Sequence, residues 1–167
     1  GYGEAGEGVT NALVRVTPDG VAGSYGKVAL VPGVERVPGN RLKPGPPPAP
    51  LRAPGDPGPL ICIESAWSGL ALDHARRGAG WLLNVTNDAW LAEEPLWTRT
   101  PAFHQHPRHL VLRSVETGLG ALRVGNNGLT GVVAPSGDWT PLLPPHGAGV
   151  AVASASPWMT ACLLYTS

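Results

Sequence analysis

The chain has 167 residues, enough for a single domain, and 43% of them are hydrophobic, so it can bury a core rather than stay disordered. Its 12 basic residues balance its 12 acidic ones, so no net field attracts nucleic acid, which we exclude as a partner. The two cysteines, Cys62 and Cys162, lie too far apart for a disulfide framework or for the spacing of zinc ligands.

Both ends of the sequence look truncated. The chain begins without Met in the glycine-rich segment GYGEAGEG (1–8), which we interpret as the interior of a longer protein. The last six residues, CLLYTS, are similar to the translation of a sequencing-adapter end. We therefore expect residues 162–167 to be non-native and residues 1–161 to be part of one domain. The alternative for the last six residues is a short apolar strand or the start of a membrane helix.

The first third of the chain predicts a β-hairpin followed by a long loop. Apolar and polar residues partly alternate over 11–16, an Asp-Gly turn follows at 19–20, and the return segment at 21–31 places Lys27 on the second arm of the hairpin. Residues 38–59 are rich in Pro and Gly, which favours extended, solvated backbone. We expect a surface loop there.

The remaining residues predict a sheet covered by helices. A short buried strand at 59–64 precedes a short amphipathic helix at 68–80 and a second apolar strand at 80–86. A longer helix is expected over 99–118, with Gly118 ending it and Pro107 near its start or at a kink. Strand patterns at 120–126, 128–135 and 148–155 indicate antiparallel pairing. The order predicts an α/β fold.

Cys62 stands at the carboxyl end of the first buried strand and just before a helix. Open α/β sheets place ligands and reactive groups at this position. Cysteine is also one of the most frequently buried residue types, so position alone allows a structural thiol. The surrounding sequence is therefore needed to distinguish a catalytic nucleophile from a buried structural thiol.

Five segments accompany this cysteine in one order: YGKVALVPGVERVP, CIES, NVTNDAW, RSVETG and RVGNNGLTG. Together they resemble the nitrilase superfamily, and within it the catalytic domain of the apolipoprotein N-acyltransferase family, over residues 8–155. A Gln-His pair at 105–106, ahead of RSVETG, matches the same family pattern. By this resemblance Cys62 is the nucleophile and Lys27 the catalytic lysine, while Glu35 and Glu64 support them. Asn87 and Trp90 are the candidates for the substrate pocket.

The resemblance implies an α-β-β-α sandwich, incomplete at both ends, with residues 1–161 as part of the catalytic domain. It implies transfer of an acyl chain from a phospholipid, through a cysteine thioester, to the N-terminal amine of a lipoprotein carrying a diacylglyceryl-cysteine. It also implies membrane helices outside this chain and an extracytoplasmic site at the bacterial inner membrane. We expect neither a cofactor nor a metal ion.

Two departures from the family pattern bear on the chemistry. Ile63 stands where the family usually has an aromatic residue, which affects any contact of that ring with the acyl chain. The superfamily's general base is a glutamate well upstream of the lysine, and Glu4 and Glu7 are not substitutes for it. A positioned base contributes about a hundredfold to ten-thousandfold in rate, so we expect the isolated chain to be nearly inactive.

Other interpretations remain open from the sequence. A soluble amidase of the same superfamily would use the same residues with water as the acceptor, and a catalytically dead module would only bind. Lys27 on its own reads as a solvated strand residue, and Glu64 as a carboxylate near a helix N-terminus. His104, His106 and His109 lack a carboxylate or thiol at ligand spacing, so we interpret them as packed or solvated side chains.

Overall fold

The structure is a computed structural model that describes residues 2–5, 8–39, 41–89, 101–145, 147–155 and 159–165. Its main element is a five-stranded mixed sheet in the order β4-β5-β6-β7-β8. The parallel strands are β4 (Pro57–Ile61), β5 (Trp81–Asn87) and β6 (Ala121–Asn126). The antiparallel strands are β7 (Thr130–Val133) and β8 (Trp139–Leu143). The predicted β-α-β order and the late antiparallel strands are confirmed.

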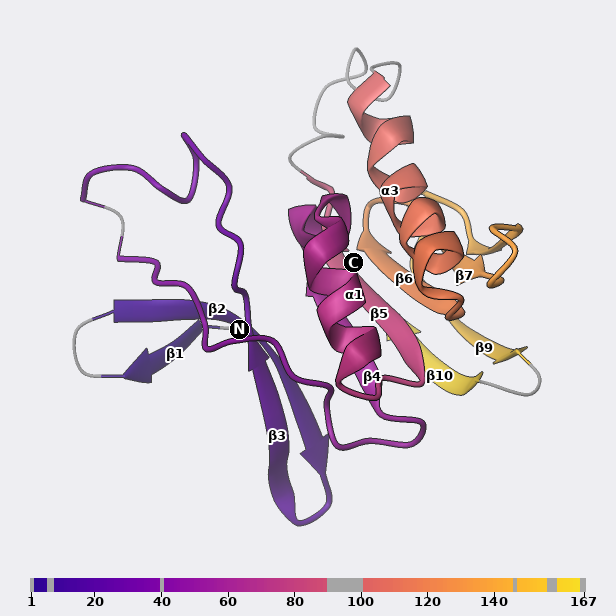
Figure 1. Ribbon diagram of the computed structural model, residues 1–167, viewed down its shortest axis with the longest axis horizontal. Helices are drawn as coiled ribbons and strands as arrows, with labels where there is room; N and C mark the ends of the chain where they lie inside the picture. The colour runs from indigo at the N-terminus through magenta and orange to yellow at the C-terminus, as the bar shows by residue number, and fades with distance from the viewer. Residues whose placement is uncertain are drawn as a thin grey trace.

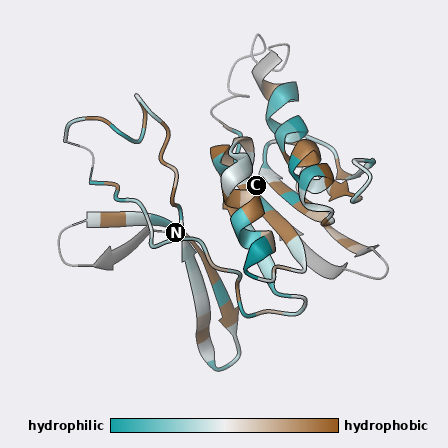
Figure 2. Cartoon of the chain, viewed as in Figure 1, coloured by the Kyte–Doolittle hydropathy of each residue, from teal (hydrophilic) through white to brown (hydrophobic). Residues whose placement is uncertain are grey.

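Two helices, α1 (Ser68–Arg76) and α3 (Pro101–Thr117), lie side by side on one face of this sheet (Figure 1). Both carry hydrophobic and hydrophilic residues around their length (Figure 2), as amphipathic helices do. Their apolar residues and those of the strands form the main core, whose fully buried members are Leu60, Ala71, Leu82, Leu110, Ala121 and Val133. The helices thus form one α layer over one β layer.

Glycines follow both helices in the left-handed conformation, with φ of +87° at Gly78 and +68° at Gly118. This conformation ends a helix at little cost for a residue without a Cβ atom. The expected end of the longer helix at Gly118 is therefore confirmed. Pro107 lies inside α3 rather than near its start, because the helix already begins at Pro101.

The opposite face of the sheet carries its own apolar residues, because neighbouring residues of a strand point to opposite faces. Trp81 and Leu122 are buried there, and Leu83, Val124, Val132 and Leu142 pack partly buried against them. A separate two-stranded antiparallel sheet pairs β9 (Gly149–Ala155) with β10 (Met159–Tyr165). Residues 162–165 are thus paired strand, while the assignment of residues 162–167 as non-native stays a prediction.

The N-terminal arm consists of a three-stranded antiparallel sheet and the loop that follows it to residue 56. Its strands are β1 (Tyr2–Ala5), β2 (Gly8–Thr17) and β3 (Gly20–Gly26), which confirms the hairpin. Lys27 does not lie on the second strand of this hairpin but directly after it. Its backbone N still donates to Asn11 O at 2.7 Å, so the hairpin fixes the position of the lysine backbone.

The Pro/Gly-rich segment is mostly exposed, as predicted, but it also contacts the hairpin. It packs along the hairpin, where Lys43 N donates to Val9 O at 2.9 Å and Gly45 N to Lys27 O at 2.7 Å. A Cβ atom at position 45 would lie 2.3 Å from Gly26 O, so this close crossing requires glycine. Leu51 is buried. Residues 57–59, predicted as the end of the loop, belong to the buried strand β4.

Candidate active site

Cys62 occupies the sharp turn at which β4 passes into the short 3₁₀ helix η1 (Cys62–Ala66). Its φ is +53°, an uncommon conformation for a residue with a side chain. The cost of such a conformation is about 1–3 kcal/mol, and such residues cluster at active sites. The carbonyl oxygen of Cys62 accepts hydrogen bonds from Ser65 Oγ at 3.2 Å and Asn84 Nδ2 at 3.4 Å, which fix the turn.

Arg113 of α3 holds the other end of the same 3₁₀ helix. Its Nη1 donates to Ala66 O at 3.0 Å and to Ser65 O at 3.4 Å, and its Nη2 pairs with Glu116 Oε1 at 2.7 Å. Carbonyls at the end of a helix lack partners within the helix, and a cation satisfies them well. The RSVETG segment therefore serves to anchor the cysteine turn on α3.

Glu64 joins the cysteine turn to the segment that carries the lysine. Its Oε1 accepts the backbone N–H groups of Val28 at 2.6 Å and Ala29 at 2.9 Å, and its Oε2 accepts that of Ile61 at 2.7 Å. Tyr25 Oη donates to Oε2 at 3.1 Å. Burial raises the pKa of this carboxyl group, and the three backbone N–H donors oppose that rise. Glu64 is thus a buried connector that also caps the 3₁₀ helix, because it accepts the backbone N–H of the N-cap residue Ile61.

Lys27 is only 1% exposed, so it is not the solvated strand residue that its position alone allowed. Its Nζ lies 2.6 Å from Glu35 Oε2, and the same oxygen accepts Val31 N at 2.7 Å. A buried ammonium group needs such a partner. Glu35 therefore holds the lysine in place, as the resemblance implies for a supporting residue.

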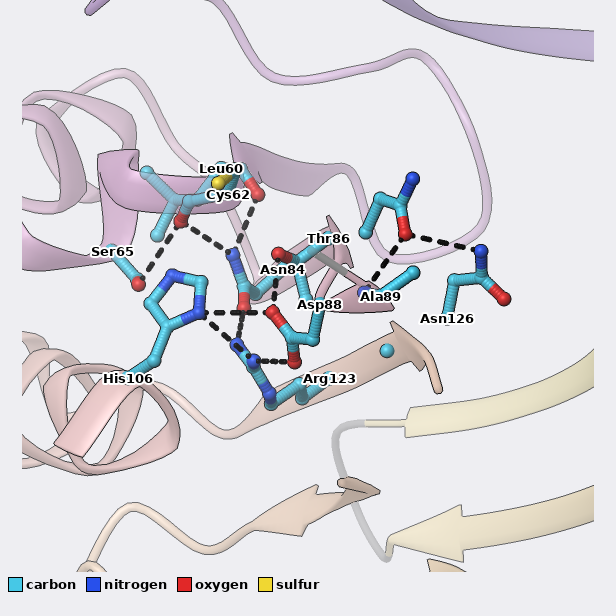
Figure 3. Close-up of polar contacts among 12 residues, drawn as sticks. Leu60, Cys62, Ser65, Asn84, Thr86, Asp88, Ala89, His106, Arg123 and Asn126 are labelled. Carbon is cyan, nitrogen blue, oxygen red and sulfur yellow. Dashed lines mark hydrogen bonds and ion pairs between the residues drawn. The ribbon is translucent and has the colours of Figure 1, made fainter. Parts of the chain in front are cut away.

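A buried polar network lies on the helix-covered face of the sheet, beneath α3 (Figure 3). Asn84 and Arg123 are aligned neighbours on β5 and β6, and Arg123 Nη1 donates to Asn84 Oδ1. Arg123 Nη2 donates to Asp88 Oδ2 at 2.6 Å, and His106 Nδ1 lies 3.1 Å from Asp88 Oδ1. Because Asn84 also donates to Leu60 O at 2.8 Å, the network reaches the strand that ends at Cys62.

The charges around Cys62 favour the thiolate. Burial raises the pKa of the thiol, but the interaction with the His106 imidazole and the positive charge of Lys27 lower it more, so that it lies below its ordinary value. Burial and the charge of Arg123 lower the pKa of His106, but the hydrogen bond with Asp88 and the interaction with the Cys62 thiol raise it to about 9. The structure thus places cationic groups from two different elements close to the thiol.

His106 is the site residue that sequence reasoning missed. It was grouped with His104 and His109 as packed or solvated, although it belongs to a Gln-His pair within the resemblance. His104 is exposed and His109 is half-buried, so the three do not form one cluster. Among the described residues, no group of histidine, cysteine and carboxylate side chains could hold a metal ion.

The candidates for the substrate pocket are only partly located. Asn87 is exposed at the end of β5, where its Oδ1 accepts Ala89 N and Asn126 Nδ2, both at 3.1 Å. Trp90 lies outside the described residues. Gly128, the second of the three glycines of the RVGNNGLTG segment, makes room for Asp88, because a Cβ atom at this position would lie 2.1 Å from Asp88 Oδ2. That segment therefore closes the polar network from the β6–β7 turn.

Comparison with known proteins agrees with this arrangement. The chain is 39% identical over 92 residues to the apolipoprotein N-acyltransferase of Brucella suis biovar 1, which covers 55% of the chain and 16% of that protein. It is 32% identical over 143 residues to the apolipoprotein N-acyltransferase of Geobacter metallireducens, covering 76% of the chain and 26% of the relative. The chain therefore spans only a small part of the length of these relatives. No family model matches it.

Solved structures of similar fold are carbon–nitrogen hydrolases. A carbon–nitrogen hydrolase from Helicobacter pylori superposes with a TM-score of 0.70 at 18% identity, over 83% of this chain and 54% of that one. A mutant amidase from Nesterenkonia sp., with acrylamide added to its active-site cysteine, gives a TM-score of 0.62 at 25% identity, over 84% and 55%. The predicted nitrilase-like fold is confirmed, and the chain is similar in sequence to apolipoprotein N-acyltransferases and in fold to carbon–nitrogen hydrolases.

Proposed function

We propose that this chain carries the nucleophile, Cys62, and the lysine, Lys27, of an apolipoprotein N-acyltransferase. The observation that carries the proposal is the joint placement of these two residues by Glu64, in a chain similar in sequence to proteins of that name. The acyl donor is a phospholipid, and the acceptor is the amine of a lipoprotein's N-terminal diacylglyceryl-cysteine.

The chemistry proceeds in two acyl transfers. The Cys62 thiol gives its proton to the general base that the resemblance implies, and the thiolate attacks the ester carbonyl of the phospholipid. The C–O bond to the glycerol backbone breaks, and the lysophospholipid leaves with the proton that the base returns. The acceptor amine then attacks the thioester, gives up a proton and releases the thiolate. In both steps negative charge develops on the carbonyl oxygen, and the ammonium group of Lys27 is the cation available to stabilise it. Glu35 keeps that ammonium group in place.

The proposed donor places the reaction at a membrane. We propose the bacterial inner membrane as the location, with the site on its extracytoplasmic side and membrane helices elsewhere in the full-length protein. Among the residues that the structure describes, no helix has the length and apolar character needed to cross a bilayer. Asn87, at the exposed end of β5, is a candidate to line the substrate pocket beside Trp90.

The test uses the full-length protein in detergent with a phospholipid and a diacylglyceryl-cysteine peptide. We expect an acyl adduct on Cys62 that hydroxylamine removes, followed by N-acylated peptide when the acceptor is added. The Cys62→Ala variant should form neither product. Full activity of that variant would refute the assignment of the nucleophile, and an adduct on another residue would do the same.

The alternative acceptor is water, which would make the protein an amidase or another carbon–nitrogen hydrolase. The similarity in fold to an amidase with a covalently modified cysteine favours this second candidate over other chemistries. The same assay separates the two, because a hydrolase releases free acid at one rate with or without the peptide. A catalytically dead binding module would give no adduct on Cys62 under any of these conditions.

A further inference from the structure

Three aligned residues lie at one level of the parallel strands, namely Leu60 on β4, Asn84 on β5 and Arg123 on β6. Residues aligned in this way on parallel strands point their side chains to the same face of the sheet. Asn84 and Arg123 are both 0% exposed. A buried amide and a buried guanidinium group are costly unless hydrogen bonds satisfy them, and apolar residues could fill the same space without that cost. Their presence at this level of the sheet therefore needs a reason.

The guanidinium group of Arg123 determines which way the Asn84 amide faces. A guanidinium group carries only donors, so Arg123 Nη1 can bond only to the oxygen of the amide, Oδ1. Nδ2 is thereby turned toward β4, where it donates to Leu60 O at 2.8 Å and to Cys62 O at 3.4 Å (Figure 3). Arg123 is itself held by Asp88 Oδ2, which accepts Nη2 at 2.6 Å. The amide therefore has one orientation, in which its donor faces the strand that ends at Cys62.

The carbonyl group at the end of this chain of contacts belongs to the residue with the uncommon backbone conformation. Cys62 has a φ of +53°, and its carbonyl oxygen accepts Asn84 Nδ2 from the sheet and Ser65 Oγ from η1. In a planar trans peptide group, the C=O of one residue and the N–H of the next point in opposite directions. Holding the Cys62 carbonyl therefore fixes the direction of the Ile63 N–H and the backbone from which the thiol projects.

We propose that Asn84 is a positioning residue for the acylation of Cys62, and that Arg123 sets the orientation in which the Asn84 amide acts. The amide keeps the Cys62 backbone in its uncommon conformation, so that Sγ approaches the acyl carbonyl carbon from one direction. Neither residue takes or gives a proton, and the general base that the resemblance implies keeps its role. This inference deepens the proposed function, on which it rests for the role of Cys62.

The test compares two reactions of Cys62 in the full-length protein that differ in how much alignment they need. Acylation by p-nitrophenyl butyrate, followed as the burst of p-nitrophenolate that Cys62→Ala lacks, requires attack on a planar carbonyl group and places charge on its oxygen. Alkylation by iodoacetamide takes place at a saturated carbon and places no charge on a carbonyl oxygen. Both rates are measured at a pH where the thiol is fully ionised, so that a change in thiol pKa affects neither.

In Asn84→Leu, which keeps the volume of the side chain and removes its donor, we expect the burst to slow by about a hundredfold, as misplacement of a reacting group does. Alkylation should change much less. The control is Val133→Ala, because Val133 is a fully buried apolar residue of β7 outside the polar network, and this variant should leave both rates unchanged. A normal burst in a folded Asn84→Leu variant, or an equal loss in both reactions, would overturn the inference.

Asn84→Asp covers the case in which Asn84→Leu fails to fold. Its carboxylate still accepts from Arg123 but cannot donate to the carbonyls of β4 and Cys62, so the same selective loss is expected, and a normal burst would overturn the inference. Arg123→Lys keeps the charge beside Asp88 and loses the planar fork that also reaches Asn84, so its burst should slow as well. A normal burst there would overturn the part assigned to Arg123.

The ester also separates this inference from the proposed function, because its reaction with Cys62 needs neither a phospholipid nor an acceptor peptide. A protein whose burst depends on Asn84, but which never takes an acyl group from a phospholipid, would refute only the proposed function. Acyl transfer from a phospholipid at an unchanged rate in both Asn84 variants would refute only the positioning role.

Discussion

The α/β layer and the N-terminal arm contribute to the same site by different means. In the layer, Cys62 directly follows β4, and Asn84 and Arg123 lie within the adjacent parallel strands β5 and β6, whose register is set by backbone hydrogen bonds. In the arm, Val16 and Val21 are 70% and 72% exposed near the tip of the hairpin, so little of its surface is packed there. The nucleophile therefore stands on the core sheet, whereas the lysine, itself buried, extends from an arm whose hairpin tip is exposed.

The contacts that join these two regions are few and specific. A small apolar cluster of Tyr25, Leu51 and Ile61 spans them, and Glu64 adds hydrogen bonds to both sides. Because Cys62 belongs to the layer and Lys27 to the arm, substitutions in the two regions should impair the reaction in two distinguishable ways. Changes in the arm should remove the cation's effect and spare the layer, whereas changes in the layer should disturb the thiol itself.

The largest effect is expected from removing the cation of the arm. Lys27→Met should lower the rate of acyl transfer by about a hundredfold to a thousandfold, because the developing negative charge on the carbonyl oxygen loses its stabilising partner. The measurement is single-turnover acylation of Cys62 by phospholipid. Lys43→Met is the control, since Lys43 is an exposed lysine of the same arm. Acylation at the rate of the unmodified protein in Lys27→Met would show that the arm supplies no catalytic charge.

The second prediction concerns Glu64, which connects the arm to the layer through its hydrogen bonds. Glu64→Gln should lower the free energy of unfolding by about 2–4 kcal/mol, because an amide cannot accept all the backbone N–H groups that the carboxylate accepts, and unpaired buried donors are costly. Tyr25→Phe removes only the hydroxyl donor of the same carboxylate, and its expected cost is about 1 kcal/mol. Denaturant unfolding of both variants gives the two values. Equal costs would mean that the backbone hydrogen bonds do not join the arm to the layer.

The sequence predicted the layer better than the arm, for a physical reason. Strands and helices of the layer have apolar periodicity and glycine stops, so the βαβ order, the end of α3 at Gly118 and the position of Cys62 could be read directly. The loop at 38–59 was predicted as solvated because its composition has no core-forming pattern. Its burial of Leu51 and its crossing at Gly45 depend on long-range contacts with the hairpin, which composition does not reveal.

The site was predicted where residues act within a recognisable motif and missed where they act through space. Cys62, Lys27, Glu35 and Glu64 are brought together as the motifs suggested. The contacts of His106 depend on Asp88, which directly follows β5, and on Arg123 of β6, and these two residues meet only when the sheet forms. A signal was present in the sequence, because a Gln-His pair at 105–106 precedes the RSVETG segment. The three histidines were nevertheless interpreted together as packed or solvated, because no carboxylate or thiol stands at ligand spacing along the chain.

A smaller effect is expected from crowding the layer at the β6–β7 turn. Gly128→Ala should cost about 1–3 kcal/mol in the free energy of unfolding, because its methyl group would displace the Asp88 carboxylate from Arg123 and His106. Alkylation of Cys62 near pH 7 should slow as well, although residue 128 does not contact the thiol. Gly69→Ala is the control, since a Cβ atom at position 69 meets nothing within 4 Å. Normal alkylation in a destabilised Gly128→Ala variant would separate the Asp88 network from the thiol.

The smallest effect concerns His74, which lies where α1 meets the arm. Its side chain is fully buried, its ring centroid is 5.5 Å from that of Tyr25, and burial lowers its pKa below the ordinary value of 6.5. Below pH 6.5 His74 binds a proton in the unfolded chain but not in the folded chain. The free energy of unfolding should therefore fall as the pH drops below 6.5. The pKa of His106 is raised instead, to about 9, so its contribution to stability is lost as the pH rises above 6.5 toward that value. The contributions of the two histidines therefore change in different pH ranges.

Comparing the protein with His74→Leu isolates this contribution, because leucine fills a similar volume and cannot be protonated. Unfolding measured between pH 5 and pH 8 should show the difference in stability changing by about 1 kcal/mol for each unit by which the pKa of His74 is lowered. The loss on acidification should be steeper in the protein than in the variant. Parallel curves would mean that His74 accepts its proton without leaving the core, and that the junction between arm and layer tolerates a charge.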